Sequence, residues 1–174
     1  ATDVVRSVAW SPDGRRLAAA GADRVVRIWN TESWQLEAAL EGHDRGLLAI
    51  EFSPDGRWLA SAGYSSAVLI HDCHTLTQWA YVSGIGTVWS MAFGADSRTL
   101  VVGGNKGCVG LWQVPNREGD LIPLRIAHSL HGALRSVALA EREQLLLTAS
   151  EEDHVICVNS MRYVRGHQTI HLTE

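Results

Sequence analysis

A four-residue turn motif that returns at a fixed interval constrains this chain more than any other feature. Ser-Pro-Asp-Gly occupies positions 11–14 and again 53–56, and a weakened copy, Gly-Ala-Asp-Ser, occupies 94–97. A fourth slot follows at 140–143. Proline in the second place presets φ for a type I turn, aspartate suits the third place, and glycine relaxes the exit. A turn that recurs about every 42 residues indicates an array of similar structural units.

Short apolar segments surround each turn in the same order. One precedes the turn (5–10, 47–52, 88–93, 134–139), a second follows it (17–21, 59–63, 100–104, 146–150), and a third comes later (26–29, 68–71, 109–112, 155–158). A weaker fourth run lies near 35–40, 78–83 and 122–127. These runs are rich in Val, Ile, Leu and Trp and are bounded by Gly, Pro, Asp and Ser, so we predict strands. The second run is rich in small residues, which suits inner strands that converge on a channel. Four strands per unit of about 42 residues is the period of a propeller blade.

The composition is that of an ordinary globular protein. The 174 residues carry a formal net charge of −4, with 46% hydrophobic and 20% charged residues, which excludes a disordered chain. Interspersed charges of both signs argue against a nucleic-acid or membrane-surface module. No apolar run approaches the roughly 20 residues that span a bilayer. The three cysteines, Cys73, Cys108 and Cys157, form no CxxC pair, and we predict buried free thiols in a reducing compartment.

The chain resembles the WD-repeat propeller family in all four units. In that family a blade opens with Gly-His, passes a Ser-Pro-Asp-Gly turn and closes its third strand with Trp-Asp. Gly42-His43 opens the second unit in register, and Trp29-Asn30, Trp112-Gln113 and the variant His71-Asp72 stand in the Trp-Asp slot. The resemblance implies an all-β fold, a partial β-propeller of four four-stranded antiparallel blades.

The repeat organises residues 1–174 as one propeller segment. We place the units at approximately 1–41, 42–83, 84–129 and 130–165, with 166–174 as the start of a further repeat or a tail. Three arrangements remain open: part of a larger propeller with the remaining blades elsewhere in the same protein, a ring closed by a second copy, or a small array by itself. We favour the first, because both ends fall in phase with the repeat and an open array leaves two unpaired edges.

Blades of the resembling family often contain an internal hydrogen-bonded set of His, Asp, Ser or Thr, and Trp, and this set is fragmentary here. The resemblance gives a structural role to Asp23 and Trp29 in the first unit, His43, Ser61 and His71 in the second, Trp112 in the third and Thr148 in the fourth. A half-satisfied polar network can cost more than an apolar core. We therefore predict that apolar packing dominates.

Tryptophan is unusually abundant, with seven residues against two phenylalanines and three tyrosines. The repeat accounts for Trp10, Trp29 and Trp112 as core anchors, but not for Trp34, Trp58, Trp79 and Trp89.

Two further repeat positions define a candidate contact surface. One is occupied by Arg6, Leu48, Trp89 and Arg135, and in the resembling family it rims the narrow face where partners dock. The position before the Asp slot, which holds Tyr64 and Asn105, points the same way. Aromatic and arginine side chains are enriched in binding hot spots, so we predict that these six residues bind partners. The alternative for Trp89 is that it packs against a neighbouring blade.

The sequence offers no constellation typical of catalysis or metal binding. His71 and His74 are expected to diverge, because neighbouring side chains of a strand point to opposite faces, and no second cluster has zinc spacing. No Gly-x-Ser-x-Gly elbow occurs. The Gly-rich segment 103–107 lacks Walker spacing and suits a turn that needs positive φ. Residues 116–120 lengthen the third unit, and we expect a solvated loop there.

These observations predict a non-catalytic protein–protein interaction scaffold that presents propeller loops to partner proteins in a multiprotein complex. We expect no cofactor, no metal, no nucleic acid and no membrane, since Arg6, Arg45 and Arg135 are too few for a basic stripe. An intracellular location, cytoplasmic or nuclear, fits this prediction. The alternative is a hydrolase-like propeller enzyme with a site at the channel mouth, which requires several convergent titratable side chains there.

Overall fold

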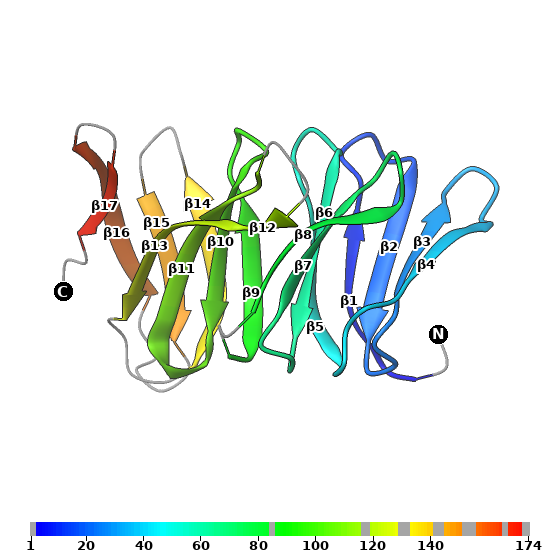
Figure 1. Ribbon diagram of the computed structural model, residues 1–174, viewed down its shortest axis with the longest axis horizontal. Coiled ribbons are helices and arrows are strands. Elements are labelled where there is room, and N and C mark those ends of the chain that lie inside the picture. Colours follow the sequence, from blue (N-terminus) through cyan, green and yellow to red (C-terminus); the bar gives the residue numbers. More distant parts are fainter. Residues whose placement is uncertain are drawn as a thin grey trace.

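Four antiparallel β-sheets stand side by side in the computed structural model (Figure 1). The structure describes residues 3–83, 86–115, 119–128, 133–140, 145–150, 156–164 and 167–171. The two ends of the chain lie at opposite ends of the row (Figure 1). The predicted sequence of antiparallel four-stranded units is therefore confirmed.

Each sheet, or blade, is formed largely by consecutive strands. Blade 1 contains β1 (Val5–Trp10), β2 (Arg16–Gly21), β3 (Val26–Asn30) and β4 (Leu36–Leu40), and blade 2 contains β5 (Leu47–Phe52), β6 (Trp58–Gly63), β7 (Val68–Asp72) and β8 (Thr77–Val82). Blade 3 contains β9 (Val88–Phe93), β10 (Thr99–Gly104), β11 (Cys108–Gln113) and β13 (Ile122–His128). Blade 4 contains β14 (Leu134–Ala140), β15 (Leu145–Ser150), β16 (Ile156–Val164) and β17 (His167–His171). Residues 167–171 thus form the outer strand of blade 4 rather than the start of a further repeat or a tail.

The inner strands β1, β5, β9 and β14 lie next to one another. They are the first run of each unit, so the prediction that the second, small-residue run forms the inner strand is wrong; β2, β6, β10 and β15 are the second strands of their sheets.

The repeated motif forms the turn between the first two strands of a blade. In blade 1 the Gly14 amide donates to the Ser11 carbonyl (2.8 Å), and the Ser11 hydroxyl donates to the Asp13 carboxylate (2.6 Å). Blade 2 repeats both bonds at the same distances. Gly14 and Gly56 have φ of 70° and 73°, which glycine adopts without a steric penalty. Ser97 takes the same conformation in the weakened copy, with φ of 58°.

The Gly-rich segment of blade 3 also forms a turn. The 3-10 turn η1 (Asn105–Gly107) joins β10 to β11, and Gly107 has φ of 67°. The predicted need for positive φ in this segment is confirmed.

One short strand was not predicted. β12 (Gly119–Asp120) pairs in parallel with the outer strand β8, which gives blade 2 a fifth strand. The Leu121 amide donates to the Tyr81 carbonyl (2.9 Å), and the Leu121 side chain is buried. The expected loop is therefore wrong for residues 119–120, because the open edge of β8 offers backbone partners and they form a strand there. Gly119 is nevertheless exposed, as expected. Residues 116–118 lie outside the described residues.

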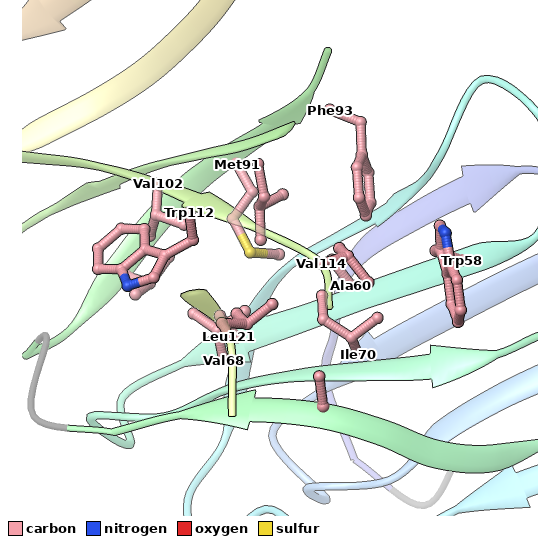
Figure 2. Close-up of a cluster of buried hydrophobic side chains, with 14 of the residues drawn as sticks. Trp58, Ala60, Val68, Ile70, Met91, Phe93, Val102, Trp112, Val114 and Leu121 are labelled. Carbon is pink, nitrogen blue, oxygen red and sulfur yellow. The ribbon is translucent and has the colours of Figure 1, made fainter. Parts of the chain in front are cut away.

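Apolar side chains fill the space between blades 2 and 3. Figure 2 shows Trp58 and Ile70 of blade 2 with Met91, Phe93 and Trp112 of blade 3 in this cluster. Leu121 joins the same cluster from beside β12. Thus the insertion of the third unit contributes to the core between the two blades.

Two tryptophans outside the repeat pattern strengthen this junction. The rings of Trp58 and Trp79 lie 5.3 Å apart, and Trp79 donates its indole N–H to the Pro115 carbonyl (3.0 Å). The Arg57 guanidinium lies 4.3 Å from the centre of the Trp58 ring. Both rings therefore have a structural explanation that the repeat did not supply.

The predicted tryptophan anchors differ in their surroundings. Trp112 is buried over Gly110, where an added Cβ would come within 1.8 Å of the indole ring. Trp29 is only half-buried. Trp10 is 55% exposed, so its prediction as a core anchor is wrong. Side chains alternate along β1, and Ala9 faces blade 2, so Trp10 lies on the opposite face of blade 1.

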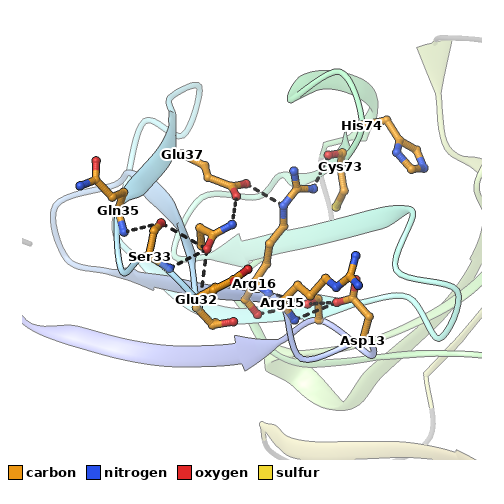
Figure 3. Close-up of polar contacts among 12 residues, drawn as sticks. Asp13, Arg15, Arg16, Glu32, Ser33, Gln35, Glu37, Cys73 and His74 are labelled. Atoms are coloured by element: carbon orange, nitrogen blue, oxygen red, sulfur yellow. Dashed lines mark hydrogen bonds and ion pairs between the residues drawn. The ribbon is translucent and has the colours of Figure 1, made fainter.

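Polar contacts also join neighbouring blades. The Ser7 hydroxyl accepts from the Ile50 amide (3.3 Å), and Ser90 accepts from the Val137 amide (3.2 Å) at the same repeat position. Figure 3 shows Arg16 of blade 1. Its guanidinium forms an ion pair with Glu37 (2.7 Å) and donates a hydrogen bond to the backbone carbonyl of Cys73 in blade 2.

Candidate protein-interaction surface

Four side chains, one from each blade, form a continuous series of ring contacts. The Arg6 guanidinium lies 5.9 Å from the centre of the Tyr64 ring. Tyr64 meets Trp89 edge to face, with ring centres 6.0 Å apart and planes at 77°. The Arg135 guanidinium lies 3.7 Å from the centre of the Trp89 ring. We call Arg6, Tyr64, Trp89 and Arg135 the Arg–aromatic row.

A register shift at the start of an inner strand places three of these side chains, Arg6, Trp89 and Arg135, whereas Tyr64 directly follows β6. The pairing of β1 with β2 passes from Val5 to Ser7, and the pairing of β14 with β15 passes from Leu134 to Ser136, so Arg6 and Arg135 have no partner in the register. Trp89 in β9 and Leu48 in β5 are skipped in the same way. A bulge breaks the alternation of a strand and re-aims the extra side chain.

Glycine makes the close backbone approach at these bulges possible. An added Cβ at Gly21 would lie 2.0 Å from the Val4 carbonyl oxygen, and one at Gly63 would lie 2.3 Å from the Gly46 carbonyl oxygen. The glycines that end β2 and β6 are therefore required where the chain enters the neighbouring inner strand.

The row combines accessible and enclosed groups. Arg6 and Arg135 are exposed, and Tyr64 is 41% exposed. Trp89 is half-buried, and its indole N–H is enclosed with no hydrogen-bond partner among the described residues. Trp89 therefore packs against neighbouring blades and is also partly exposed.

Two predicted surface residues lie apart from these ring contacts. Leu48 is half-buried. Asn105 is also half-buried, its backbone N–H donates to the Thr87 carbonyl (2.9 Å), and its side chain lies against Gly86. The structure thus joins four of the six predicted residues through their rings and guanidinium groups.

A cleft of about 710 Å³ adjoins the row at Tyr64. Its wall contains Asp44 and Arg45 before β5, and Gln78 and Tyr81 on β8. Tyr81 is 43% exposed. Tyr64 therefore belongs both to the row and to a concave surface of blade 2.

The internal polar set is assembled only in part. His43 shares hydrogen bonds with the hydroxyls of Ser61 (2.8 Å) and Ser65 (3.4 Å). His71 is buried nearby, and its Nδ1 has no partner among the described residues. Burial lowers the pKa of both imidazoles to about 4, and in His43 the nearby His71 adds to this effect. Both rings are neutral at pH 7.

The other predicted structural residues are in different environments. Asp23 accepts from the Arg27 guanidinium (2.6 Å) within blade 1. Thr148 is buried, and its hydroxyl has no hydrogen-bond partner in the described part of the chain. Of the seven predicted structural residues, only His43 and Ser61 form a hydrogen bond with each other in the described residues.

The segment around His71 and His74 is structural. Asp72 accepts from the backbone amides of His74 (2.8 Å) and Thr75 (3.3 Å), which closes a tight turn. Cys73 is a buried free thiol, and burial raises its pKa to about 12. Among the described residues, no group of three or more His, Cys, Asp or Glu side chains is placed to hold a metal ion. No helix in the same residues is long and apolar enough to cross a membrane.

Stacked four-stranded blades and the repeated turn define the class of β-propeller repeat proteins. The family model described as "WD domain, G-beta repeat" matches residues 1–30, 34–72 and 77–113. The chain belongs to the WD40 family.

Similar proteins match only parts of this chain or exceed it in length. "General transcriptional corepressor TUP1" of Saccharomyces cerevisiae is 38% identical over 48 residues, which cover 28% of this chain and 7% of that protein. "Probable cytosolic iron-sulfur protein assembly protein CIAO1" of Mus musculus is 51% identical over 41 residues, 22% of this chain and 12% of that protein. The solved "Structure of U3-55K" has a TM-score of 0.82 at 19% identity and covers 99% of this chain and 53% of its own. The chain thus matches small parts of the curated relatives and spans about half of that solved structure.

Proposed function

We propose that this chain is a non-catalytic scaffold that binds partner proteins through the Arg–aromatic row and the adjoining cleft at Tyr64. The row carries this proposal, because side chains from four blades meet in one accessible series. Aromatic and arginine side chains contribute disproportionately to protein–protein binding. The packed blades form a rigid support, so the side chains of the row need no conformational change to bind a partner.

The charges of the row favour an acidic partner segment. Arg6 and Arg135 stand at its two ends, and Arg45 lines the cleft next to Tyr64. Guanidinium groups bind carboxylates with two parallel hydrogen bonds and also stack on aromatic rings. We propose that the partner presents carboxylates to the arginines and an apolar or aromatic side chain to Tyr64 and Trp89.

The proposal extends to the setting in which the scaffold works. The names of these relatives refer to a transcriptional corepressor and to cytosolic iron–sulfur protein assembly. We propose that this chain likewise acts inside the cell, in the cytoplasm or the nucleus, as a subunit of a multiprotein complex. We propose protein partners and no cofactor.

The test compares the proteins that the intact chain captures with those that variants of the row capture. Arg135→Ala removes the cation over Trp89, and Trp89→Ala removes the ring shared by Tyr64 and Arg135. We expect each change to weaken a stoichiometric partner by at least about tenfold, the loss typical of a hot-spot residue. Quantitative mass spectrometry after affinity capture measures the loss.

Trp34→Ala is the matched control for both variants. Trp34 is 63% exposed in the β3–β4 connection and lies outside the row. Capture should be the same for this variant and for the unchanged chain. If Trp89→Ala and Arg135→Ala together leave every stoichiometric partner bound, the proposed surface is wrong.

A further inference from the structure

A small pocket opens between blades 2 and 3, away from the Arg–aromatic row. Trp58 begins β6 and lines this pocket, whereas Tyr64 of the row follows the other end of β6. The volume of about 150 Å³ is well below the roughly 300–1,000 Å³ of small-molecule sites, so the pocket suits one side chain of a partner. Its wall contains two arginines, two aspartates and two tryptophans, which are Arg57, Arg98, Asp55, Asp96, Trp58 and Trp79.

The guanidinium of Arg57 is stacked on the aromatic wall and keeps donors available. It lies 4.3 Å from the centre of the Trp58 ring and 5.8 Å from that of Trp79, and its side chain is 48% exposed. Its Nε and Nη2 approach one oxygen of Asp72 at 3.4 and 3.5 Å, longer than the roughly 2.7–2.9 Å of a strong guanidinium–carboxylate bond. Among the described residues, Nη1 donates no hydrogen bond. Stacking therefore orients the guanidinium without saturating it.

The two aspartates of the wall are bonded within their own turns. Asp55 accepts from the Ser53 hydroxyl (2.6 Å) and the Arg57 backbone N–H (3.0 Å). Asp96 accepts from the hydroxyl and the backbone N–H of Thr99, both at 2.7 Å. In the described part of the chain, neither carboxylate forms an ion pair with a guanidinium. These aspartates therefore leave the outward donors of Arg57 unused, while their charge opposes a doubly charged anion more than a singly charged one.

The junction between blades 1 and 2 contains the carboxylate that this pocket lacks. Arg16 and Glu37 of blade 1 occupy the repeat positions of Trp58 and Trp79. There the Glu37 carboxylate accepts from the Arg16 guanidinium at 2.7 Å (Figure 3). Between blades 2 and 3 a ring replaces that carboxylate, and no described carboxylate lies as close to the Arg57 guanidinium. One junction thus supplies its own anion, whereas the other has room and donors for an anion from outside.

We infer that this pocket binds the carboxylate side chain of an aspartate or glutamate on a partner protein. Arg57 donates to the carboxylate, and Arg98, which uses Nη2 on the Val114 carbonyl (3.0 Å), provides a second cation. The half-buried Trp79 ring contacts the methylene groups of the bound side chain. A carboxylate suits the pocket better than a phosphate, because the guanidinium fork pairs with two oxygens and the wall aspartates oppose a second negative charge. The inference is independent of the Arg–aromatic row.

The test titrates the 174-residue chain with the capped tripeptide Gly-Glu-Gly and follows the indole N–H signal of Trp79 by NMR. This N–H donates to the Pro115 carbonyl beside the pocket, and the spectrum of Trp79→Phe assigns the signal. We expect a saturable shift with a dissociation constant of roughly 1–10 mM. The capped tripeptide Gly-Gln-Gly has the same size without the charge, so it should bind at least about tenfold more weakly. Equal binding of the two peptides, or no saturable shift, overturns the inference.

Three variants assign the binding to this pocket. Arg57→Gln should weaken binding of the glutamate peptide by at least about tenfold. Arg15→Gln is the matched control, because Arg15 follows its turn in the same way, is exposed and does not line the pocket. Trp89→Ala changes only the Arg–aromatic row, and both of these variants should bind the peptide unchanged. The backbone amide spectrum of each variant checks that it folds.

Two further outcomes would contradict the assignment. If Arg57→Gln binds the glutamate peptide as tightly as the unchanged chain does, the peptide binds elsewhere. If the capped tripeptide with phosphoserine in place of glutamate binds at least about tenfold more tightly, the pocket is a phosphate site and not a carboxylate site.

Discussion

The inner strands β1 and β9 place similar side chains in opposite environments. Met91 and Phe93 of β9 are enclosed between blades 2 and 3, while Val8 and Trp10 at the same positions of β1 are exposed to solvent. The strands have the same length and similar pairing with their second strands. The difference therefore comes from the neighbouring blade, since a repeat sets the direction of a side chain and the adjacent repeat sets its burial.

Truncating the aromatic residue in both strands gives the largest expected contrast. Phe93→Ala should lower the free energy of unfolding by about 3–5 kcal/mol, because it opens a cavity in a packed core. Trp10→Ala should lower it by less than about 1 kcal/mol, because the side chain is exposed. Urea unfolding of dilute protein measures both values. Equal losses would show that β1 and β9 are not in different environments.

Residues 119–121, which comprise β12 and Leu121 and which we call the strap, run beside β8 of blade 2. The strap and the residue after it provide a second contrast between neighbouring residues. Leu121→Ala removes a buried side chain from the cluster between blades 2 and 3, with an expected loss of about 2–4 kcal/mol. Ile122→Ala, at a side chain that is 45% exposed, should cost less than about 1 kcal/mol. The same urea titration measures the pair. A small loss for Leu121→Ala would mean that the strap does not contribute to the junction.

Gly110 tests how tightly the buried tryptophan of blade 3 is packed. Gly110→Ala should cost about 1–3 kcal/mol, because its Cβ collides with the Trp112 ring. Trp112→Phe provides a smaller ring that leaves room for the added Cβ. Combining the two changes should therefore lower the free energy of unfolding by less than the sum of the two single losses. Thermal unfolding of the three variants gives this coupling. Additive losses would contradict the proposed collision.

Acid should weaken blade 2 through its two buried histidines. The pKa of His43 and His71 falls from 6.5 to about 4 on folding, so only the unfolded chain takes up their protons between these values. The contribution of these two histidines to the free energy of unfolding is complete above pH 6.5, and it is lost as the pH falls toward 4. We expect the free energy of unfolding, measured by urea titration, to fall by about 2–3 kcal/mol through these two histidines between pH 7.5 and pH 5.5.

A comparison with His71→Phe isolates this effect. Burial raises the pKa of Glu51, and that shift acts in the opposite direction. Because the Glu51 contribution is present in both proteins, it cancels when their pH profiles are subtracted. The decrease in the free energy of unfolding between pH 7.5 and pH 5.5 should be clearly smaller in His71→Phe than in the unchanged chain. Identical profiles would rule out His71 as a source of the acid sensitivity.

The strands could be predicted because each carries its own local pattern. Apolar runs and the Ser-Pro-Asp-Gly turn are properties of adjacent residues, and β1, β2, β5 and β6 appear where these patterns occur. The exposure of Trp10 could not be predicted in the same way, because the burial of a side chain on this face depends on a surface that is distant in the sequence. β12 was missed because a two-residue parallel pairing leaves no periodic pattern.

Part of the candidate surface could be predicted by aligning the repeats of this chain with one another. Arg6, Trp89 and Arg135 share one repeat position, and aligning the units found them without knowledge of the bulge that re-aims them. Their contact with Tyr64 required coordinates, because no pattern in the sequence specifies which rings of neighbouring blades meet. The role of Leu48 and Asn105 in binding stays a prediction.

The strap at β12 has a consequence for the way the chain opens. Repeat proteins unfold through local units coupled mainly to their neighbours. β12 lies between two strands of blade 3 in the sequence but hydrogen-bonds to β8 of blade 2. The outer edge of blade 2 therefore cannot open without releasing the segment that leads into β13. In amide hydrogen exchange, blades 2 and 3 should gain and lose protection together, while β4 of blade 1 should exchange earlier and on its own.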